Sequence, residues 1–287
     1  MEIKIITDST SEITQLQSKE FDVPVVPIKT IFSGKEYREG VDIMPEEFYQ
    51  KLEQSEELPT TSQPSPGDFE AVFRTAIEEG NTDIILICIS SKLSGTLQSA
   101  IIARGAIQAS NDALDANIHI IDSESATIGL NLLVQRAITM RDAGKSAEEI
   151  VDTIEAAKKK LRLCAAIETL DYLHKGGRLS TTSKIAGTLL NVKPLISVVD
   201  GEIKVMGKCR GMKKACDEVL NMVDEAGGID FDYPVALGYT GEREGFTQFE
   251  EVATIYLKGQ DTGILGIGAA IGTHVGPGAV AIAFFVK

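Results

Sequence analysis

A run of apolar residues, Ile84–Ile89, is followed directly by the hydroxyl-rich segment Ser90–Thr96 and then by a helical pattern from about Leu97. This order predicts a buried strand, a turn and a helix. In an open α/β sheet such a turn lies at the carboxyl end of its strand, where ligands bind, and the N-terminus of the next helix favours an anion. The segment therefore predicts an anion site, although the helix-capping preference of serine would by itself explain Ser94 equally well.

Strand and helix signals alternate over the first half of the chain. Short apolar runs at 3–7, 84–89 and 118–121 are each followed by a helical pattern, which predicts a mainly parallel sheet with helices on both faces. The capping-box spacing of Ser9 and Glu12 predicts that the first helix begins directly after the first strand and places Asp8 at the binding edge. We expect this α/β/α domain to span residues 1–160 and to end with an amphipathic helix at 146–160.

The second half of the chain has a different order of elements. Apolar segments at 194–199 and 202–206 flank Asp200-Gly201, a pair that suits a two-residue hairpin turn. Helical patterns at 212–224 and 246–257 alternate with strand patterns at 234–238 and 263–267. Residues 161–287 are therefore expected to form an α+β domain, with a mixed or antiparallel sheet covered by helices. The last strand, 279–286, belongs either to this sheet or to the first domain. The fold class is α/β with two domains.

Composition excludes several classes of protein. The 287 residues carry a formal charge of -14, which argues against a nucleic-acid or anionic-membrane surface. No apolar run reaches the roughly 18 residues of a spanning helix and no signal peptide is evident, so we expect a cytoplasmic protein. The 4 cysteines form no C-x-x-C pair and the 3 histidines are far apart, so neither a disulfide framework nor a metal site is predicted.

Three further segments carry candidate binding residues. Pro59–Asp68 is rich in hydroxyls and prolines and predicts a rigid polar loop. His274 lies in the glycine-rich segment Gly272–Gly278, read as extended, where its imidazole could bond a carboxylate or a phosphate. Arg178 follows Gly176-Gly177 and could pair with an anion or steady the domain junction. The chain has no P-loop, no dinucleotide fingerprint and no nucleophile elbow, so no nucleotide or other cofactor is predicted.

In this order the motifs of the chain resemble those of the DegV family, whose bacterial members include the fatty-acid-binding (FakB-type) acyl carrier of fatty acid kinase. The resemblance runs from end to end and rests on five ordered segments: Thr7–Ser11, Thr60–Ser65, Ser90–Ala100, Gly176–Arg178 and Gly272–Gly278.

The resemblance implies a lipid-binding protein with one long-chain fatty acid in a closed tunnel between two domains. The residues carried over for the fatty-acid carboxylate are Thr61, Ser62, Ser94, Gly95 and His274, with Arg178 as a supporting or partner contact. A separate ATP-binding fatty acid kinase subunit would phosphorylate the carboxyl group, and an acyltransferase of phospholipid synthesis would take up the acyl phosphate. The carrier itself would be non-catalytic and would need no cofactor.

Two other functions stay open at this point. Ser94 as nucleophile and His274 as base would make the protein a lipid or acyl-phosphate hydrolase, although no acidic residue to orient His274 is evident from the sequence. The same motifs would also suit a carrier of another amphipathic carboxylate, such as a retinoid-like or branched acid.

Overall fold

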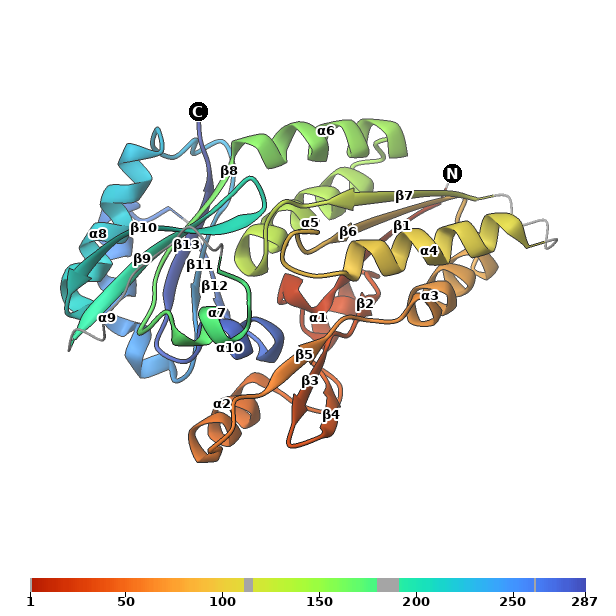
Figure 1. Ribbon diagram of the computed structural model, residues 1–287. Helices are drawn as coiled ribbons and strands as arrows, with labels where there is room; N and C mark the ends of the chain where they lie inside the picture. The colour runs from red at the N-terminus through yellow and green to blue at the C-terminus, as the bar shows by residue number, and fades with distance from the viewer. Residues whose placement is uncertain (1, 111–115, 180–190, 261) are drawn as a thin grey trace.

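The first of two main sheets is parallel. The computed structural model describes residues 2–110, 116–179, 191–260 and 262–287. Within these residues, four strands pair in the order β2-β1-β6-β7 (Figure 1): β1 (Ile3–Asp8), β2 (Val25–Val26), β6 (Asp83–Cys88) and β7 (Asn117–Asp122). All three pairings are parallel, as the alternation of strand and helix signals predicts.

Helices cover both faces of this sheet because its strands are apolar on both sides. Alternate residues of β6 point to opposite faces: Ile84 and Leu86 pack against α3 (Pro66–Glu78) and α4 (Thr96–Ala109). Ile85 and Ile87 belong to the core formed with α5 (Thr127–Asp142) and α6 (Ala147–Lys160). The predicted helix at 146–160 is confirmed, with Ser146 as its N-cap.

The second main sheet is mixed and is built from residues after 160. Its order is β10-β9-β8-β13-β11-β12 in the described part of the chain: β8 (Leu161–Ala166), β9 (Val192–Val199), β10 (Glu202–Arg210), β11 (Val235–Tyr239), β12 (Thr262–Gly266) and β13 (Val280–Phe285). The hairpin turn at Asp200-Gly201 is confirmed, since both residues have positive φ. The last strand pairs with β8 and β11 and so belongs to this sheet rather than to the first.

Helices of this part cover the outer face of the mixed sheet and border the space between the sheets. The core of the outer face includes residues of α8 (Met212–Glu225) and α9 (Thr247–Tyr256), the latter preceded by the short 3-10 helix η2 (Arg243–Phe246). The short helices α7 (Asp171–Lys175) and α10 (Ala269–Val275) lie beside each other (Figure 1).

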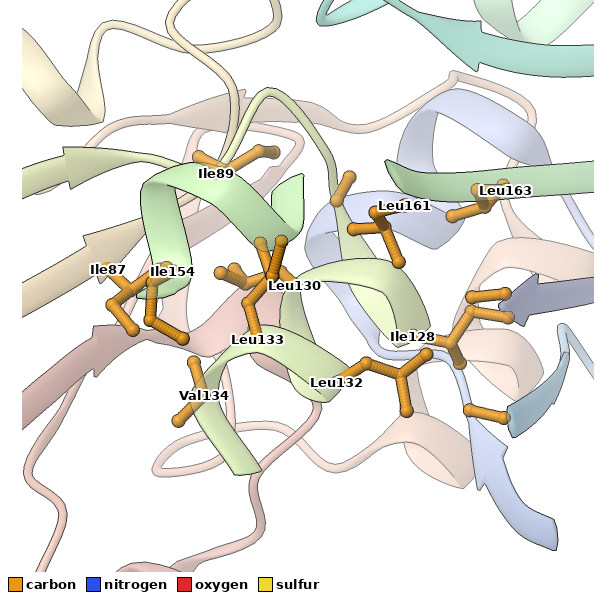
Figure 2. Packing of buried hydrophobic residues seen from close by; sticks show 14 of the residues in the cluster. Ile87, Ile89, Ile128, Leu130, Leu132, Leu133, Val134, Ile154, Leu161 and Leu163 are labelled. Atoms are coloured by element: carbon orange, nitrogen blue, oxygen red, sulfur yellow. The ribbon is translucent and has the colours of Figure 1, made fainter. Parts of the chain in front are cut away.

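Helix α5 lies between the two sheets and is buried along most of its length. Figure 2 shows its side chains between Ile87 and Ile89, which belong to β6 and the turn after it, and Leu161 and Leu163 of β8. The apolar core is therefore continuous from one sheet to the other. The division of the chain at residue 160 separates the two sheets, and its division into two domains stays a prediction.

A small lobe of the first half was missed in the sequence. Strands β3 (Lys29–Phe32), β4 (Lys35–Arg38) and β5 (Thr60–Ser62) form a separate antiparallel sheet of the described residues, next to α2 (Pro45–Gln54) at the bottom of Figure 1. The segment Pro59–Asp68 is thus not wholly a loop: it begins as β5 and ends in the first turn of α3.

The predicted capping box at Ser9 and Glu12 is wrong. Asp8 accepts the N–H of Thr10 instead, so that residues Ser9–Ser11 form a short 3-10 helix, η1. Glu12 has a φ of 58°, in the left-handed region that ends this helix. The first α-helix, α1 (Gln15–Glu20), begins later, behind its own capping box at Thr14 and Gln17.

Candidate functional site

A cavity of about 320 Å³, here called the main cavity, lies between the mixed sheet and the carboxyl ends of β1 and β6. Its apolar wall includes residues of β8, β9 and β13, the start of β10 and the turn that follows β6. Its polar residues from the predicted segments are Thr61, Ser62, Gln63, Ser94, Arg178 and His274. The position agrees with the general rule that ligands of open α/β sheets bind at the carboxyl ends of the strands.

Thr61 and His274 come together from distant parts of the chain. Thr61 lies on β5 and His274 near the end of α10, and Thr61 Oγ1 is 2.8 Å from His274 Nε2. The other imidazole nitrogen, Nδ1, is buried and has no hydrogen-bond partner among the described residues. A proton on Nδ1 would be a buried donor without an acceptor, whereas a proton on Nε2 can be donated to Thr61. The neutral ring is therefore assigned its proton on Nε2. His274 then donates to Thr61, and the Thr61 hydroxyl proton is available to a ligand.

His274 is held in its neutral form. Burial, reinforced by the positive charge of Arg178, lowers the pKa of His274 to about 4. At neutral pH the imidazole therefore supplies hydrogen bonding and no charge. The location of His274 in a helix corrects the prediction of an extended segment. The glycines around it nevertheless have a use, because Gly276 and Gly278 both have positive φ where the chain leaves α10.

Two glycines leave room for the polar side chains of the cavity. A β-carbon on Gly176 would lie 2.2 Å from His274 Nδ1, and one on Gly95 would lie 2.0 Å from Gln63 Oε1. Such contacts would force either side chain to move. Gly95 thus brings Gln63 against the turn after β6, although Gly95 itself does not line the main cavity.

Ser94 does not act as the simple helix cap that its position suggested. The N-cap of α4 is Gly95, which forms no side-chain cap bond. The Ser94 hydroxyl lies 2.8 Å from Thr96 Oγ1 and accepts the N–H of Thr96 at 3.3 Å. Ser94 also lines the main cavity, so its hydroxyl is placed both to support the first turn of α4 and to reach a ligand.

Arg178 joins two turns at the edge of the main cavity. Its Nε donates to the carbonyl of Leu93 at 3.1 Å, and its Nη1 donates to the carbonyl of Gly176 at 2.7 Å. The guanidinium therefore fixes the turn before Ser94 relative to the end of α7. This geometry is that of a supporting residue that also borders the cavity.

Three further polar residues lie near the site, and only Thr127 escaped the sequence analysis, because Asp8 and Thr10 belong to the segment Thr7–Ser11. Thr10 and Thr127 line the main cavity, and Thr127 has a φ of 46°, which is unusual for a β-branched residue. Asp8, predicted at the binding edge, is buried and accepts the N–H of Ile89 at 2.8 Å. It ties the end of β1 to the end of β6, and burial raises its pKa. No sequence pattern marks Thr127, because its position in the cavity wall depends on this unusual backbone conformation.

The low pKa of His274 predicts a loss of stability in acid. Between pH 6.5 and about 4 the unfolded chain binds a proton at this residue and the folded chain does not. The free energy of unfolding should therefore decrease by roughly 3 kcal/mol as the pH falls through this window. The pKa values of Asp8, Glu12 and Glu39 are raised by burial, so these groups act in the opposite direction and favour the fold as the pH falls.

The contribution of His274 is isolated by urea unfolding of the wild type and of His274→Gln from pH 7 to pH 4. We expect the stability of the wild type to decrease relative to that of the variant. A difference that stays constant over this range would contradict the assignment of a buried neutral imidazole.

Neither a metal site nor a membrane-spanning helix is present in the described residues. No group of three or more His, Cys, Asp or Glu side chains there could hold a metal ion. None of the helices in the described ranges is long and apolar enough to cross a membrane.

Comparison with known proteins assigns the family. The model described as "Uncharacterised protein, DegV family" matches residues 2–287. A DegV domain-containing protein of Caldanaerobacter subterraneus subsp. tengcongensis is 39% identical over 293 residues, covering 99% of each chain. The solved structure of a fatty-acid-binding DegV family protein from Thermus thermophilus is 32% identical, with a TM-score of 0.87 over 100% of both chains. A stearic-acid-binding protein from Eubacterium ventriosum is 30% identical, with a TM-score of 0.89 over 99% of this chain and 97% of that one. The chain belongs to the DegV family.

Proposed function

We propose that the protein binds one long-chain fatty acid in the main cavity and holds the carboxylate at Thr61, Ser94 and His274. The observation that carries this proposal is the joining of these hydroxyl and imidazole groups to the apolar wall of one cavity. The relatives from Thermus thermophilus and Eubacterium ventriosum, which bind fatty acids, support it. The volume of about 320 Å³ lies within the usual range of small-molecule sites.

The two ends of a fatty acid would make different contributions. Burial of an acyl chain of about sixteen carbons at about 0.8 kcal/mol per CH₂ supplies on the order of 10 kcal/mol before the costs of association. A carboxylate buried without partners would be rejected or neutralised, so hydrogen-bond donors are required at the head. The tail therefore supplies affinity, and the polar cluster supplies orientation. Ser62, which lines the main cavity, would complete this cluster, and Gly95 would contribute by letting Gln63 lie against the turn after β6.

The geometry favours binding over hydrolysis. A serine hydrolase needs its histidine to bond the nucleophile and to be oriented by an acid. Among the described residues His274 Nε2 bonds Thr61, Nδ1 has no partner, and the Ser94 hydroxyl bonds Thr96. An imidazole with a pKa of about 4 is also a weak base at neutral pH.

We further propose that the bound carboxyl group is presented to a separate ATP-binding fatty acid kinase subunit, which forms the acyl phosphate. This step rests on the sequence resemblance to acyl carriers of that kinase. The absence of a P-loop motif from the sequence agrees with it. Delivery of the acyl phosphate to an acyltransferase and a cytoplasmic location belong to the same proposal.

Native mass spectrometry of the purified protein is the first test, followed by denaturing extraction and identification of any released molecule. We expect a stoichiometric long-chain fatty acid. A protein that carries none and takes up none when fatty acids are added would overturn the proposal. Release of a different amphipathic carboxylate would keep the site and change the ligand.

Removal of a single hydroxyl from the carboxylate-binding residues, here called the head cluster (Thr61, Ser94 and His274), should weaken fatty-acid binding without unfolding the protein. Thr61→Val and Ser94→Ala each leave a buried charged acceptor short of a donor, which costs roughly 1–3 kcal/mol of binding free energy. Calorimetric titration of the delipidated variants measures this loss. Thr60→Val is the matched control, since Thr60 is exposed and the side chains of successive strand residues face opposite ways. Unchanged affinity in both head variants would remove these residues from the site.

A further inference from the structure

We propose that Glu12 and Glu39 are positioning residues for the head-group site: together they hold the N-terminus of α10 and so place His274 against Thr61. Neither carboxylate lines the main cavity. Their effect on fatty-acid affinity rests on the proposed function, whereas their effect on His274 does not.

The two carboxylates bond the backbone at the start of α10. Glu12 Oε2 accepts the N–H of Gly268 at 2.9 Å, and Glu39 Oε1 accepts the N–H of Ala270 at 2.8 Å. A β-carbon on Gly268 would lie 2.4 Å from Glu39 Oε1 and 3.1 Å from Glu12 Oε2, so only glycine lets both carboxylates approach. The N–H groups at the start of a helix have no acceptor inside the helix. Here two acids from the first half of the chain each accept one of them.

The second oxygen of each carboxylate is also held. The Thr127 hydroxyl donates to Glu12 Oε1 at 2.9 Å, and the Ser9 hydroxyl donates to Glu39 Oε2 at 2.5 Å. Thr127 lines the main cavity and has the unusual positive φ described above. A chain of contacts therefore runs from the cavity wall at Thr127, through Glu12 and α10, back to the cavity at His274.

Helix α10 is short enough to transmit a shift at its start. It has 7 residues, and His274 lies about one turn beyond Ala270. The helix is also packed closely: a β-carbon on Gly272 would lie 2.6 Å from Tyr49 Oη and 2.7 Å from a ring carbon of Phe48. Tyr49 Oη donates to the carbonyl of Ile267 just before the helix. With one side fixed in this way, release of the N-terminus should tilt or turn the helix and move His274.

A pair of buried acids is a demanding way to cap a helix. Burial raises the pKa of both Glu12 and Glu39. The negative charge of Asp8 raises both pKa values further, and that of Glu39 also raises the pKa of Glu12. A serine or asparagine would satisfy the same N–H groups without this penalty. The arrangement is therefore explained better by the placement of a functional helix than by capping alone.

The surroundings allow variants at these residues to fold. Glu12 and Glu39 line a second cavity of about 460 Å³, which is bordered by the exposed side chains of Leu16 and Val41. Water can therefore enter the space left by a shortened side chain and bond the released N–H groups. Glu12→Gln and Glu39→Gln keep the volume of the side chain, and Glu39→Ala removes the contact.

The first readout is the pKa of the His274 imidazole in the ligand-free protein. It is measured by an NMR titration of protein labelled with ¹⁵N-histidine. The chain has 3 histidines, so His274→Gln assigns the signal. We expect the pKa of His274 to rise from about 4 towards 6.5 in Glu39→Ala as the ring moves into water. Loss of a negative charge would by itself lower this pKa, so a rise reports displacement. An unchanged titration in Glu39→Ala and in Glu12→Ala, which both remove the acceptor, would overturn the proposal.

The second readout compares a long-chain fatty acid with the fatty alcohol of the same length, which lacks the carboxylate. We expect Glu39→Ala to weaken binding of the acid about tenfold or more and to weaken binding of the alcohol much less, since α10 also contributes Ala270, Ile271 and Val275 to the apolar wall, with partial rescue in Glu39→Gln. Equal losses for both ligands would indicate a general loosening of the fold and overturn the proposal.

Glu149→Gln is the matched control, because Glu149 also holds a helix N-terminus, that of α6, through the N–H of Ser146. It should change neither readout. A wild-type protein that binds neither ligand would reject the proposed function, and the His274 titration would still decide the role of the two acids.

Discussion

Replacement of Ala165 by leucine is expected to abolish high-affinity binding of long-chain fatty acids. Ala165 on β8 lies opposite Ala281 on β13, and both small side chains form part of the wall of the main cavity. Leucine adds three carbon atoms to this wall, displaces a similar length of acyl chain at about 0.8 kcal/mol per CH₂ and crowds the rest. The combined loss should be roughly 3 kcal/mol or more, about 100-fold in the dissociation constant.

The measurement is a titration of delipidated Ala165→Leu with a series of saturated acids of decreasing length. Binding should return for acids that are a few carbons shorter, since the head cluster is untouched. Ala106→Leu makes the same chemical change at an exposed position of α4 and serves as the control. Equal affinities of wild type and Ala165→Leu for the longest acid would mean that the tail does not lie against β8.

Gly176→Ala should reduce fatty-acid binding strongly while the protein stays folded. The φ of Gly176 is -73°, which alanine adopts readily, and alanine is the better helix former by about 1 kcal/mol. Its β-carbon would however lie 2.2 Å from His274 Nδ1. The imidazole must therefore move away from Thr61, and the two groups lose the geometry in which they can share a carboxylate. We expect a loss of roughly 3 kcal/mol of binding free energy.

Thermal unfolding and calorimetric titration of the same sample separate these two effects. Gly105→Ala is the control, because Gly105 lies in α4 with nothing within 4 Å of the position of a β-carbon. It should raise stability and leave binding unchanged. Full affinity in Gly176→Ala would contradict a role for His274 at the head of the ligand.

Most strands of the two main sheets could be predicted from local patterns, whereas the two-residue strand β2 was missed. The run Ile84–Ile89 and the turn at Asp200-Gly201 each carry a signal that depends only on neighbours in sequence. The small strands β3, β4 and β5 lack such a signal, because their residues are largely polar and half-exposed. Of these strands, β3 and β5 also contact α10, which lies more than 200 residues later in the chain, so part of their packing is invisible to local patterns.

Local patterns singled out Ser94, His274 and Arg178 as candidate binding residues, but only the resemblance joined them with Thr61 in one site. Nothing in the local sequence relates Thr61 to His274, yet their side chains are 2.8 Å apart. The capping motif at Ser9 and Glu12 failed for a related reason. Ser9 and Glu12 bond partners that lie far away in the sequence, Glu39 and Gly268, and these tertiary bonds outweigh the local capping preference. Sequence reasoning could find neither pair, since each exists only in the folded chain.

The position of α5 between the two sheets has a consequence for synthesis of the chain. This helix leaves the ribosome with β1 and β6 already made, but the strands that cover its other side, β8, β11 and β13, follow later, the last of them ending at Phe285. Until then a long apolar surface stays exposed to water, which makes the nascent first half prone to aggregation. We therefore expect a chain truncated before β13 to depend on chaperones, and the two halves to be inherited together rather than exchanged between proteins as separate modules.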